Sequence, residues 1–351
     1  MDEPPANRPL YQISATCVCL FISLLTIIAG CDRTPFDLNL KANDPLGNTS
    51  TEAQKTTRVA LVMKTLTNPF FLEMERGARR AEREFAVDLI VKMAASETSI
   101  QQQIGIVEDL IRDQVDALVI APGDSVELIP VLRKAQLAGI VVVNIDNQLD
   151  PFFSKKNGLA AVPFISVDNK AAAYRSAKYI ADKIQFPAQA AIMGGIPEAL
   201  NSDDRIEGAL KAFRENPKIS LLTVDSGHWK IEEGHDLMEQ WLLRYPQLDL
   251  IFAANDMMAL GAIEALREAG REDVLVSSFD ALIPARQAIE QGTLQASVDQ
   301  NPAVQGYLGV QYALRALNGE VLPEITYVDA ELITASAGAA IKPLKSPGGD
   351  S

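Results

Sequence analysis

The sequence has very few cysteines, and their positions exclude several kinds of site. Only three occur in 351 residues, at Cys17, Cys19 and Cys31, all close to the start of the chain. The rest of the sequence has no thiol. Disulfides, cysteine-ligated metals and cysteine nucleophiles are therefore excluded from residue 32 onward.

Histidine is also scarce, and the common catalytic motifs are missing. His228 and His235 are the only two histidines, and we interpret them as surface residues rather than as a metal-binding pair. The chain contains no G-x-S-x-G, H-E-x-x-H or P-loop sequence, and Gly194-Gly195 lacks the spacing of a dinucleotide-binding loop. We therefore expect a protein that is not an enzyme and that has neither a cofactor nor a metal.

An excess of positive charge is missing as well. Asp and Glu number 46 against 32 Lys and Arg, which gives a formal net charge of −14. Phosphate backbones repel such a chain, so we do not expect nucleic acid as a partner. With 48% hydrophobic and 22% charged residues the composition is that of a globular protein, and 351 residues suffice for two domains.

One long uncharged run is present, near the start of the sequence. Residues 13–30 carry no charge, and the run ends in the letters IAGC, of which the last is Cys31. This lipobox pattern combines an apolar stretch, two small residues and a thiol that can be acylated. It predicts a lipoprotein signal peptide over residues 1–30 and lipidation at Cys31. An uncleaved membrane anchor of minimal length is the alternative.

Two polar segments flank the main body. Residues 31–57 are rich in Asn, Asp, Thr, Pro and Gly without apolar periodicity, which is typical of a flexible tether. Residues 342–351 predict a disordered tail. We expect the body to lie in the periplasm or at the cell surface, lipid-anchored to a bacterial membrane.

In the body, short β-branched runs alternate with longer stretches of helical period. The predicted strands are 59–63, 88–91, 117–120, 140–145, 164–167, 190–193, 221–224, 250–253, 274–277 and 295–298. The predicted helices are 70–86, 99–114, 125–138, 170–185, 203–215, 231–244, 256–269, 281–291 and 302–318. This order predicts an α/β fold of two doubly wound lobes, each with a parallel sheet. A (β/α)₈ barrel is the competing architecture.

Polar and aromatic side chains follow several of the predicted strands. In open parallel sheets a ligand binds at the carboxyl ends of the strands. The residues found there, or near an adjacent helix start, are Lys64, Asn68, Phe70, Phe71, Asp146, Asn147, Arg205, Asn255, Asp280 and Gln300. Carboxylates and amides can bridge neighbouring hydroxyls, and aromatic faces can cover the C–H patches of a sugar ring. The set suits a neutral polyhydroxyl ligand.

Each of these residues also has a simpler structural interpretation. Asn68, Asn255 and Asp280 could serve only as helix caps. Arg205 could be a surface ion-pair partner, and Trp229 could belong to the core. The joint pattern favours the ligand site over these separate explanations.

Eight motifs occur in order between residues 58 and 334: VALVMKTLTNPFF, VVVNIDNQLD, SVDN, DDRIEGALKAF, GHWKIEEG, FAANDMMALGA, SSFDALIPAR and ASVDQNP. Together they resemble periplasmic sugar-binding proteins of the ribose-binding type, which serve ABC importers and have the periplasmic-binding-protein type I fold. Within that family the chain looks most like the D-allose-binding members.

The resemblance implies a monosaccharide bound between two lobes that are joined by a three-segment hinge. The implied ligand contacts are Lys64, Asn68, Phe70, Phe71, Asp146, Asn147, Arg205, Trp229, Asn255, Asp280 and Gln300. The implied hinge positions are Asp168, Asn169, Gln300 and Asp329. The implied lobes are 58–167 plus 301–329 at the amino-terminal side and 168–300 plus 330–341 at the carboxy-terminal side.

Two residues depart from the family pattern. Asn147 stands where ribose-type members have Arg and allose-type members have Glu, and Phe71 stands where the allose type has Trp. A changed polar residue alters which hydroxyl a site accepts, and this can change the sugar. We therefore expect an allose- or ribose-like aldose without choosing between them.

The expected function is capture of the sugar by closure of the hinge, followed by delivery to the permease and ATPase subunits of an ABC transporter. We expect a monomer. A sugar sensor that presents the closed form to a chemoreceptor or sensor kinase is the alternative. Glycoside hydrolysis by Asp146 and Asp280 is a weaker hypothesis, because Lys64 and Arg205 favour carboxylates that accept hydrogen bonds. A LacI-type regulator would need a basic DNA-binding segment where the lipobox stands.

Overall fold

The computed structural model describes residues 56–160 and 162–335. The predicted signal peptide, Cys31, most of the tether and the tail lie outside these residues. The strands are β1 (Arg58–Met63), β2 (Asp88–Met93), β3 (Ala117–Ile120), β4 (Val141–Ile145), β5 (Phe164–Ser166), β6 (Ala188–Gly194), β7 (Ile219–Ser226), β8 (Leu248–Ala253), β9 (Leu275–Ser277), β10 (Ala296–Asp299), β11 (Ile325–Tyr327) and β12 (Glu331–Thr334). The helices are α1 (Pro69–Phe85), α2 (Ile100–Arg112), α3 (Ile129–Leu137), α4 (Pro151–Lys156), α5 (Asn169–Ala181), α6 (Leu200–Arg214), α7 (Ile231–Arg244), α8 (Asp256–Glu268), α9 (Ile283–Gln291) and α10 (Pro302–Leu317).

The strands form two open sheets of six strands each. Sheet A has the order β11-β5-β4-β3-β1-β2, and sheet B has the order β12-β10-β9-β8-β6-β7. All pairs are parallel except β10 and β12, which run antiparallel with Val298 opposite Leu332. Two open sheets confirm the doubly wound α/β fold over the closed barrel. We name sheet A with helices α1–α4 and α10 lobe A, and sheet B with helices α5–α9 lobe B.

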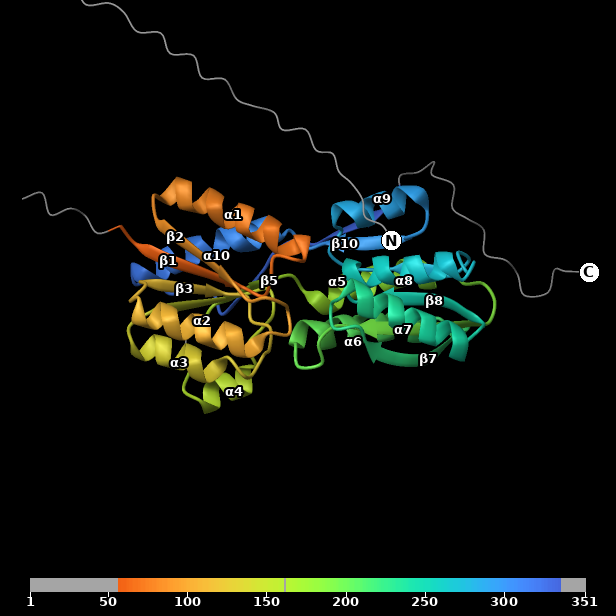
Figure 1. Cartoon of the computed structure of the whole chain (residues 1–351), viewed down its shortest axis with the longest axis horizontal. Coiled ribbons are helices and arrows are strands. Elements are labelled where there is room, and N and C mark those ends of the chain that lie inside the picture. Colours follow the sequence, from red (N-terminus) through yellow and green to blue (C-terminus); the bar gives the residue numbers. More distant parts are fainter. Residues whose placement is uncertain (1–55, 161, 336–351) are drawn as a thin grey trace, which may run out of the picture. The chain divides into compact units, whose positions relative to one another are not determined.

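The chain passes between the two sheets three times. The passages lie between β5 and α5, between β10 and α10, and between β11 and β12. Figure 1 shows these connections in the middle of the molecule. Because the first five strands and β11 belong to one sheet, each lobe is assembled from segments that are distant in the sequence.

The two faces of β1 show why its sequence is uniformly apolar. Val59, Leu61 and Met63 belong to one buried hydrophobic cluster, whereas Ala60 and Val62 belong to another. Helices α1 and α10 lie on one side of sheet A and helices α2 and α3 on the other (Figure 1). Successive side chains of the strand point to opposite faces of the sheet, and a layer of helices covers each face, as in other sheets covered on both sides.

Helices α1 and α10 pack close together through two glycines. A Cβ atom at Gly77 of α1 would lie 1.7 Å from the carbonyl oxygen of Ala303, and one at Gly306 of α10 would lie 2.1 Å from that of Met74. Each glycine therefore contacts the backbone of the opposite helix. This contact fixes α10 against lobe A directly after the chain returns from sheet B.

Three short elements differ from the prediction. Strands β11 and β12 have three and four residues with exposed or half-buried side chains, so they lack an apolar alternation. Helix α4 has six residues, none of them buried. These elements lie at sheet edges or at the surface, where packing leaves no hydrophobic pattern in the sequence.

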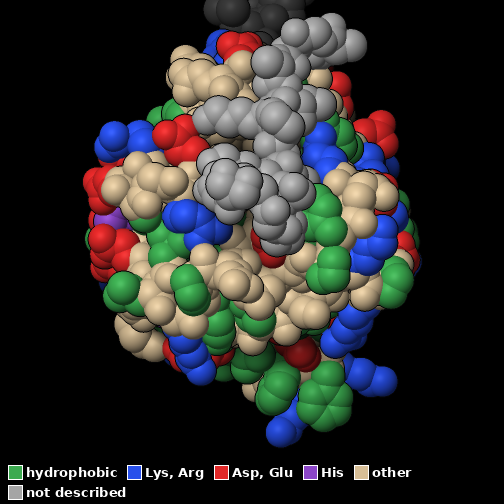
Figure 2. Space-filling view, turned by 90° about the vertical axis from the view of Figure 1, so that its right-hand side faces the viewer, with side chains coloured by type: hydrophobic (Ala, Val, Ile, Leu, Met, Phe, Trp, Pro, Cys, Tyr) green, Lys and Arg blue, Asp and Glu red, His purple; other side chains and the backbone are tan. Residues whose placement is uncertain are grey.

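Acidic and basic side chains are interspersed on the face of the molecule shown in Figure 2, with hydrophobic side chains between them. Within the described ranges, no helix is long and apolar enough to cross a membrane.

Candidate ligand-binding site

A buried ion pair lies at the carboxyl ends of β1 and β4. The Nζ atom of Lys64 is 2.8 Å from Oδ2 of Asp146, and both side chains are 3% exposed. Apart from this contact, Oδ2 accepts no hydrogen bond among the described residues. The backbone of Asp146 has a positive φ of 65° and is held by the Ser166 hydroxyl, which donates to its carbonyl oxygen at 2.8 Å. The carboxylate is thus positioned with an oxygen left to accept a hydrogen bond.

The first loop supplies an amide and two aromatic rings. Asn68 caps α1, because its Oδ1 accepts from the backbone N–H of Phe70 at 3.0 Å. The helix-cap interpretation therefore holds, although the Asn68 Nδ2 group also reaches another carboxylate, that of Glu97, at 3.0 Å. Phe70 and Phe71 are buried edge to face, and the Lys64 ammonium lies 5.8 Å from the centre of the Phe71 ring.

Sequence reasoning missed Glu97. It lies between β2 and α2, at the carboxyl ends of the strands of sheet A, where Lys64 also lies. The residue is partly exposed, yet its carboxyl group lies deep enough that burial raises its pKa to about 6, while Lys64 and the Asn68 hydrogen bond oppose this shift. Lys64 was selected because ligands bind at the carboxyl ends of parallel strands, and Glu97 also follows a strand, β2. Its position in the sequence could therefore have identified it as a site residue.

Arg205 is the centre of the site on lobe B. Its guanidinium is 3% exposed and donates to Oδ1 of Asn169 at 2.8 Å, to the carbonyl oxygen of Ala254 at 3.0 Å and to Oε1 of Gln300 at 3.3 Å. It also lies 3.7 Å from Oδ1 of Asp280. Burial lowers the pKa of Arg205, and the facing carboxylates oppose this effect. The surface ion-pair interpretation is therefore wrong for this residue.

The loop that carries Asp280 has an unusual backbone. Asp280 and Ala281 have φ values of 113° and 50°, and neither is a glycine. Asp280 is not a helix cap, since the cap position of α9 is Leu282. Its Oδ1 accepts from Nε2 of Gln300 at 2.6 Å. Burial raises the pKa of Asp280 well above its usual range, against the opposing charge of Arg205.

A second buried carboxylate, Asp256, holds this loop in place. It accepts hydrogen bonds from the Ser278 hydroxyl, from the Ser297 hydroxyl at 2.8 Å and from the backbone N–H of Leu282 at 2.6 Å. Burial raises its pKa to about 7, and these hydrogen bonds oppose the shift. Three groups from the flanking chain thus converge on one side chain, which stabilises the positive φ of Asp280.

Trp229 provides an aromatic side chain with an unsatisfied donor. The residue is 4% exposed, and its indole N–H has no hydrogen-bond partner among the described residues. Its ring lies against Gly195, where a Cβ atom would be 2.0 Å from the ring. Asn255 caps α8 by accepting from the backbone N–H of Met258 at 2.9 Å, and its Nδ2 donates to the Trp229 carbonyl at 3.2 Å. The cap interpretation holds for Asn255 too.

The charged groups of the two lobes face one another. The charges of Asp146 and Glu97 on lobe A both act on the pKa of Arg205 on lobe B, and Arg205 acts on the pKa of Glu97. Because such interactions weaken with distance, the strand-end residues of sheet A and the Arg205 network belong to one electrostatic site.

Asn147 lies beside this site, and protein groups satisfy its side chain. Its Nδ2 donates to the carbonyl oxygen of Pro122 and to the Ser125 hydroxyl, each at 3.2 Å. Its Oδ1 accepts from the backbone N–H of Asn201, on lobe B, at 3.2 Å. The residue is fully buried. Its amide group is therefore engaged between the two lobes.

The four predicted hinge residues lie at the three passages between the sheets. Asp168 caps α5 by accepting from the backbone N–H of Ala171 at 2.9 Å, and Asn169 follows it. The carbonyl oxygen of Gln300 accepts from Nε2 of Gln305 at 2.9 Å. The carbonyl oxygen of Asp329 accepts from Nδ2 of Asn301 at 2.9 Å, which joins two of the passages.

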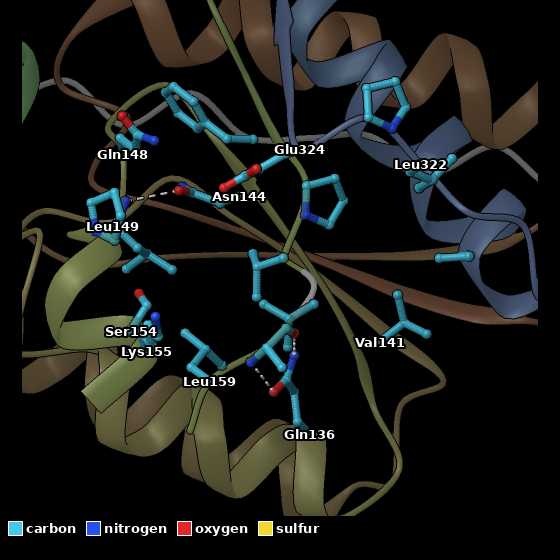
Figure 3. A pocket seen from close by; sticks show the side chains of 18 of the residues that line it. Gln136, Val141, Asn144, Gln148, Leu149, Ser154, Lys155, Leu159, Leu322 and Glu324 are labelled. Atoms are coloured by element: carbon cyan, nitrogen blue, oxygen red, sulfur yellow. Dashed lines mark hydrogen bonds between the residues drawn. The ribbon is translucent and has the colours of Figure 1, made fainter. Parts of the chain in front are cut away.

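Two cavities lie outside the ion pair of Lys64 and Asp146. The larger, of about 1080 Å³, is on lobe A between β4, α4 and the chain before β11, and its lining includes Val141, Leu159 and Leu322 (Figure 3). The smaller, of about 190 Å³, is beside the first passage and is lined in part by Asp168 and Tyr327. Neither lining includes Lys64, Asp146 or Arg205 itself, although the smaller cavity is also lined by Asn169, which accepts a hydrogen bond from Arg205. Cavity volume alone therefore does not identify the site.

The two histidines point to different partners. His228 contacts Glu233, whereas His235 lies 3.1 Å from Oε2 of Glu268 on α8. His235, Glu239 and Glu268 are close enough to hold a metal ion, although both carboxylates are exposed. The hydrogen bond with Glu268 raises the pKa of His235. This cluster shares no residue with the ligand site described above.

Comparison with known proteins defines the class. Residues 59–320 match the periplasmic binding protein domain family, which is three quarters of the chain, so the protein belongs to that family. Its relatives are extracytoplasmic substrate-binding proteins and not enzymes, which agrees with the prediction from the sequence.

Three relatives show how specific the similarity is. The chain is 38% identical to a D-ribose/D-allose-binding protein of Pseudomonas aeruginosa over 83% of its own length and 93% of the relative. It is 32% identical to the D-allose-binding periplasmic protein of Escherichia coli, over 81% and 94% of the two chains. A solute-binding protein of an ABC transporter from Actinobacillus succinogenes, solved with bound D-allose, has 37% identity and a TM-score of 0.75 over 80% of this chain and 98% of that one.

Proposed function

We propose that the protein captures a monosaccharide, an allose- or ribose-like aldose, between its two lobes and delivers it to the permease of an ABC transporter. The observation that carries this proposal is a pair of buried polar groups at the facing strand ends. Nε1 of Trp229 can only donate and has no hydrogen-bond partner among the described residues, and Oδ2 of Asp146 pairs with the Lys64 ammonium but accepts no further hydrogen bond there. Buried polar groups normally have partners. A ligand with several hydroxyl groups can satisfy both.

The charge balance of the site favours a neutral ligand. Lys64 and Arg205 contribute two positive charges, and Asp146, Glu97 and Asp280 contribute three carboxyl groups. Burial raises the pKa of both Glu97 and Asp280, which reduces the negative charge they contribute. Neither a strongly anionic nor a strongly cationic ligand would complement such a set.

The names of the relatives support the same class of ligand. D-ribose and D-allose occur in the names of the two relatives compared above, and D-allose is bound in the structure from Actinobacillus succinogenes. In this proposal Lys64, Asn68, Phe70, Phe71 and Asp146 contact the sugar from lobe A. Arg205, Trp229, Asn255, Asp280 and Gln300 contact it from lobe B, and Glu97 joins the first group.

We further propose that the lobe boundaries are those implied by the resemblance and that the passages at Asp168-Asn169, Gln300 and Asp329 form a hinge. Lipidation of Cys31, after removal of residues 1–30, would hold the protein near its permease and raise the local concentration of the captured sugar. We propose a monomer, since the ligand site is formed within a single chain. The permease and ATPase remain proposed partners.

A thermal-unfolding screen tests the proposal. The purified protein is heated alone and with D-allose, D-ribose, D-galactose, D-glucose and D-xylose. A ligand that binds only the folded state raises the melting temperature. We expect a large rise with D-allose or D-ribose and little with D-xylose. The absence of a rise with every sugar, in a sample that unfolds cooperatively, would overturn the assignment of a monosaccharide.

A further inference from the structure

The start of helix α6 receives its hydrogen-bond acceptors from the opposite lobe. The backbone N–H of Leu200 donates to the Ser125 hydroxyl at 3.1 Å, and that of Asn201 donates to Oδ1 of Asn147 at 3.2 Å. The cap residue of α6 itself, Ala199, provides no side-chain acceptor. The first N–H groups of a helix have no partner within the helix, so they need acceptors from elsewhere. Here lobe A supplies two of them.

The acceptors on lobe A are held in place before α6 reaches them. Asn147 donates to the carbonyl oxygen of Pro122 and to the Ser125 hydroxyl, and this hydroxyl also lies 3.4 Å from Oδ1 of Asn147, to which it can donate. A third hydrogen bond between the lobes runs from the backbone N–H of Ser125 to the carbonyl oxygen of Glu198 at 3.1 Å. Ser125 and Asn147 are 2% and 0% exposed. The two acceptor side chains on lobe A are therefore shielded from solvent in the observed arrangement.

We propose that Ser125 and Asn147 are positioning residues for ligand capture: they cap α6 across the boundary between the lobes and so stabilise the closed arrangement. This inference rests on the proposed function. It assigns Asn147 to closure of the protein and not to recognition of one hydroxyl group of the sugar. All polar atoms of the Asn147 side chain already have protein partners, so a ligand contact would have to displace one of them.

The two roles have different consequences for affinity. When a ligand binds only the closed arrangement, its Kd is inversely proportional to the closed fraction of the free protein. A cap that stabilises this arrangement therefore changes the Kd of every ligand by the same factor. A side chain that contacts one hydroxyl changes the Kd of sugars that present this hydroxyl and leaves their epimers less affected.

Leu200→Pro removes one of these hydrogen bonds without altering lobe A. Proline has no N–H and is favoured at the first position of a helix, which Leu200 occupies. The preceding residue, Ala199, has φ −101° and ψ 116°, the extended conformation that proline requires before it. Leu200→Ala is the matched control, because it shortens the side chain and retains the N–H.

We expect Leu200→Pro to bind its sugar about fivefold more weakly than Leu200→Ala, the effect of losing one hydrogen bond worth about 1 kcal/mol. Binding is measured by isothermal titration calorimetry. In solution scattering without sugar, the radius of gyration of Leu200→Pro should exceed that of Leu200→Ala, because loss of the cap lowers the closed fraction. Equal affinities together with equal radii would overturn the proposal. If no sugar binds the wild type, the proposed function is wrong. The comparison of the two radii of gyration then tests the proposed cap of α6 by itself.

The variant Asn147→Ala distinguishes a role of Asn147 in closure of the lobes from a role in recognition of the sugar. We expect its Kd to rise by about the same factor, three- to tenfold, for each sugar that binds the wild type. Adding Leu200→Pro to Asn147→Ala should weaken binding by less than it does in the wild type, because the two hydrogen bonds form together. A factor that differs more than about fivefold between epimeric sugars would show that Asn147 contacts a hydroxyl, and would overturn its assignment to closure.

Discussion

The ammonium group of Lys64 neutralises the buried carboxylate of Asp146 across the carboxyl end of sheet A. The two groups are 2.8 Å apart, both are buried, and Oδ2 of Asp146 accepts no further hydrogen bond among the described residues. The two residues follow β1 and β4, which β3 separates in the sheet. A long side chain is thus needed to span the gap, which explains why a lysine suits this position.

Replacement of Lys64 by methionine should destabilise the protein. It leaves the buried Asp146 carboxylate without a counter charge, a change that typically costs about 3–5 kcal/mol. The free energy of unfolding is measured with urea. In the double variant Lys64→Met/Asp146→Asn we expect most of the loss to be recovered, because the uncompensated charge is gone. A double variant that is less stable than Lys64→Met would contradict the role of this pair.

Asp280→Asn should remove most of the sugar affinity and leave the fold intact. The amide retains an oxygen that can accept from Gln300, and Arg205 keeps its hydrogen bonds to Asn169, Ala254 and Gln300. We expect at least a tenfold rise in Kd, about 1.4 kcal/mol or more, with a melting temperature within a few degrees of the wild type. Glu207→Gln, which neutralises an exposed carboxylate, is the control. An unchanged Kd would refute the site assignment.

The stability of the protein should depend on pH through Asp256. Burial raises the pKa of this carboxyl from 3.8 to about 7. Below pH 4 it is protonated in both states, and its contribution is fully present. Between pH 4 and 7 the unfolded chain releases the proton while the folded protein retains it, so the free energy of unfolding falls as the pH rises.

Asp256→Asn isolates this effect, since the amide does not titrate. The difference in unfolding free energy between wild type and variant should decrease by an amount on the order of 3 kcal/mol from pH 4 to pH 7.5, because each unit of pKa corresponds to about 1.4 kcal/mol. Urea titrations at several pH values provide the measurement. A difference that stays constant or grows with pH would contradict the raised pKa.

Gly195→Ala should disturb the ligand site through Trp229. A Cβ atom at this position would overlap the indole ring, which is enclosed by protein and has to shift. We expect weaker sugar binding and an altered fluorescence spectrum, whereas Trp241 keeps its hydrogen bond to Asp225 and gives a constant background. In Trp229→Phe the same glycine substitution should have a smaller effect on Kd. An equal change in Kd in the wild type and in Trp229→Phe would show that Gly195→Ala does not act through the Trp229 ring.

Removal of divalent metals should leave sugar binding unchanged. The cluster of His235, Glu239 and Glu268 lies on α7 and α8 and shares no residue with the Arg205 network. Titration calorimetry with and without EDTA tests this. A lower affinity in EDTA that zinc restores would contradict the expectation of a metal-free site, and His235→Ala would then show whether this cluster is responsible.

The sequence was most informative where strands are buried on both faces. Residues 117–120 were predicted without error as a strand, and helix 231–244 was predicted with its observed ends. Both have strong patterns, an apolar run in the strand and a charged stripe in the helix. Strand β12 was missed, and with it the antiparallel pairing to β10, because a sheet-edge strand of four residues has little apolar character to recognise.

In the site, sequence reasoning selected residues but not their partners. Lys64 and Arg205 were expected near the carboxylates of Asp146 and Asp280, yet the pairing of Lys64 with Asp146 depends on the order of strands in sheet A. Asp256 was not selected, since an acidic residue in the first turn of a helix is common. Its role depends on Ser278 and Ser297, which come from two later strand ends. Only the folded arrangement brings these three residues together.

The close contact of Gly77 with Ala303 limits how the protein can move. Helix α10 begins at Pro302 and is already clamped on α1 at its second residue. In the proposed hinge motion α10 would therefore move with lobe A, and the backbone of this passage would have to turn before Pro302. If the proposed hinge operates, its axis would pass near Gln300, which donates to Asp280, so that part of the site would move little while the more distant residues move further.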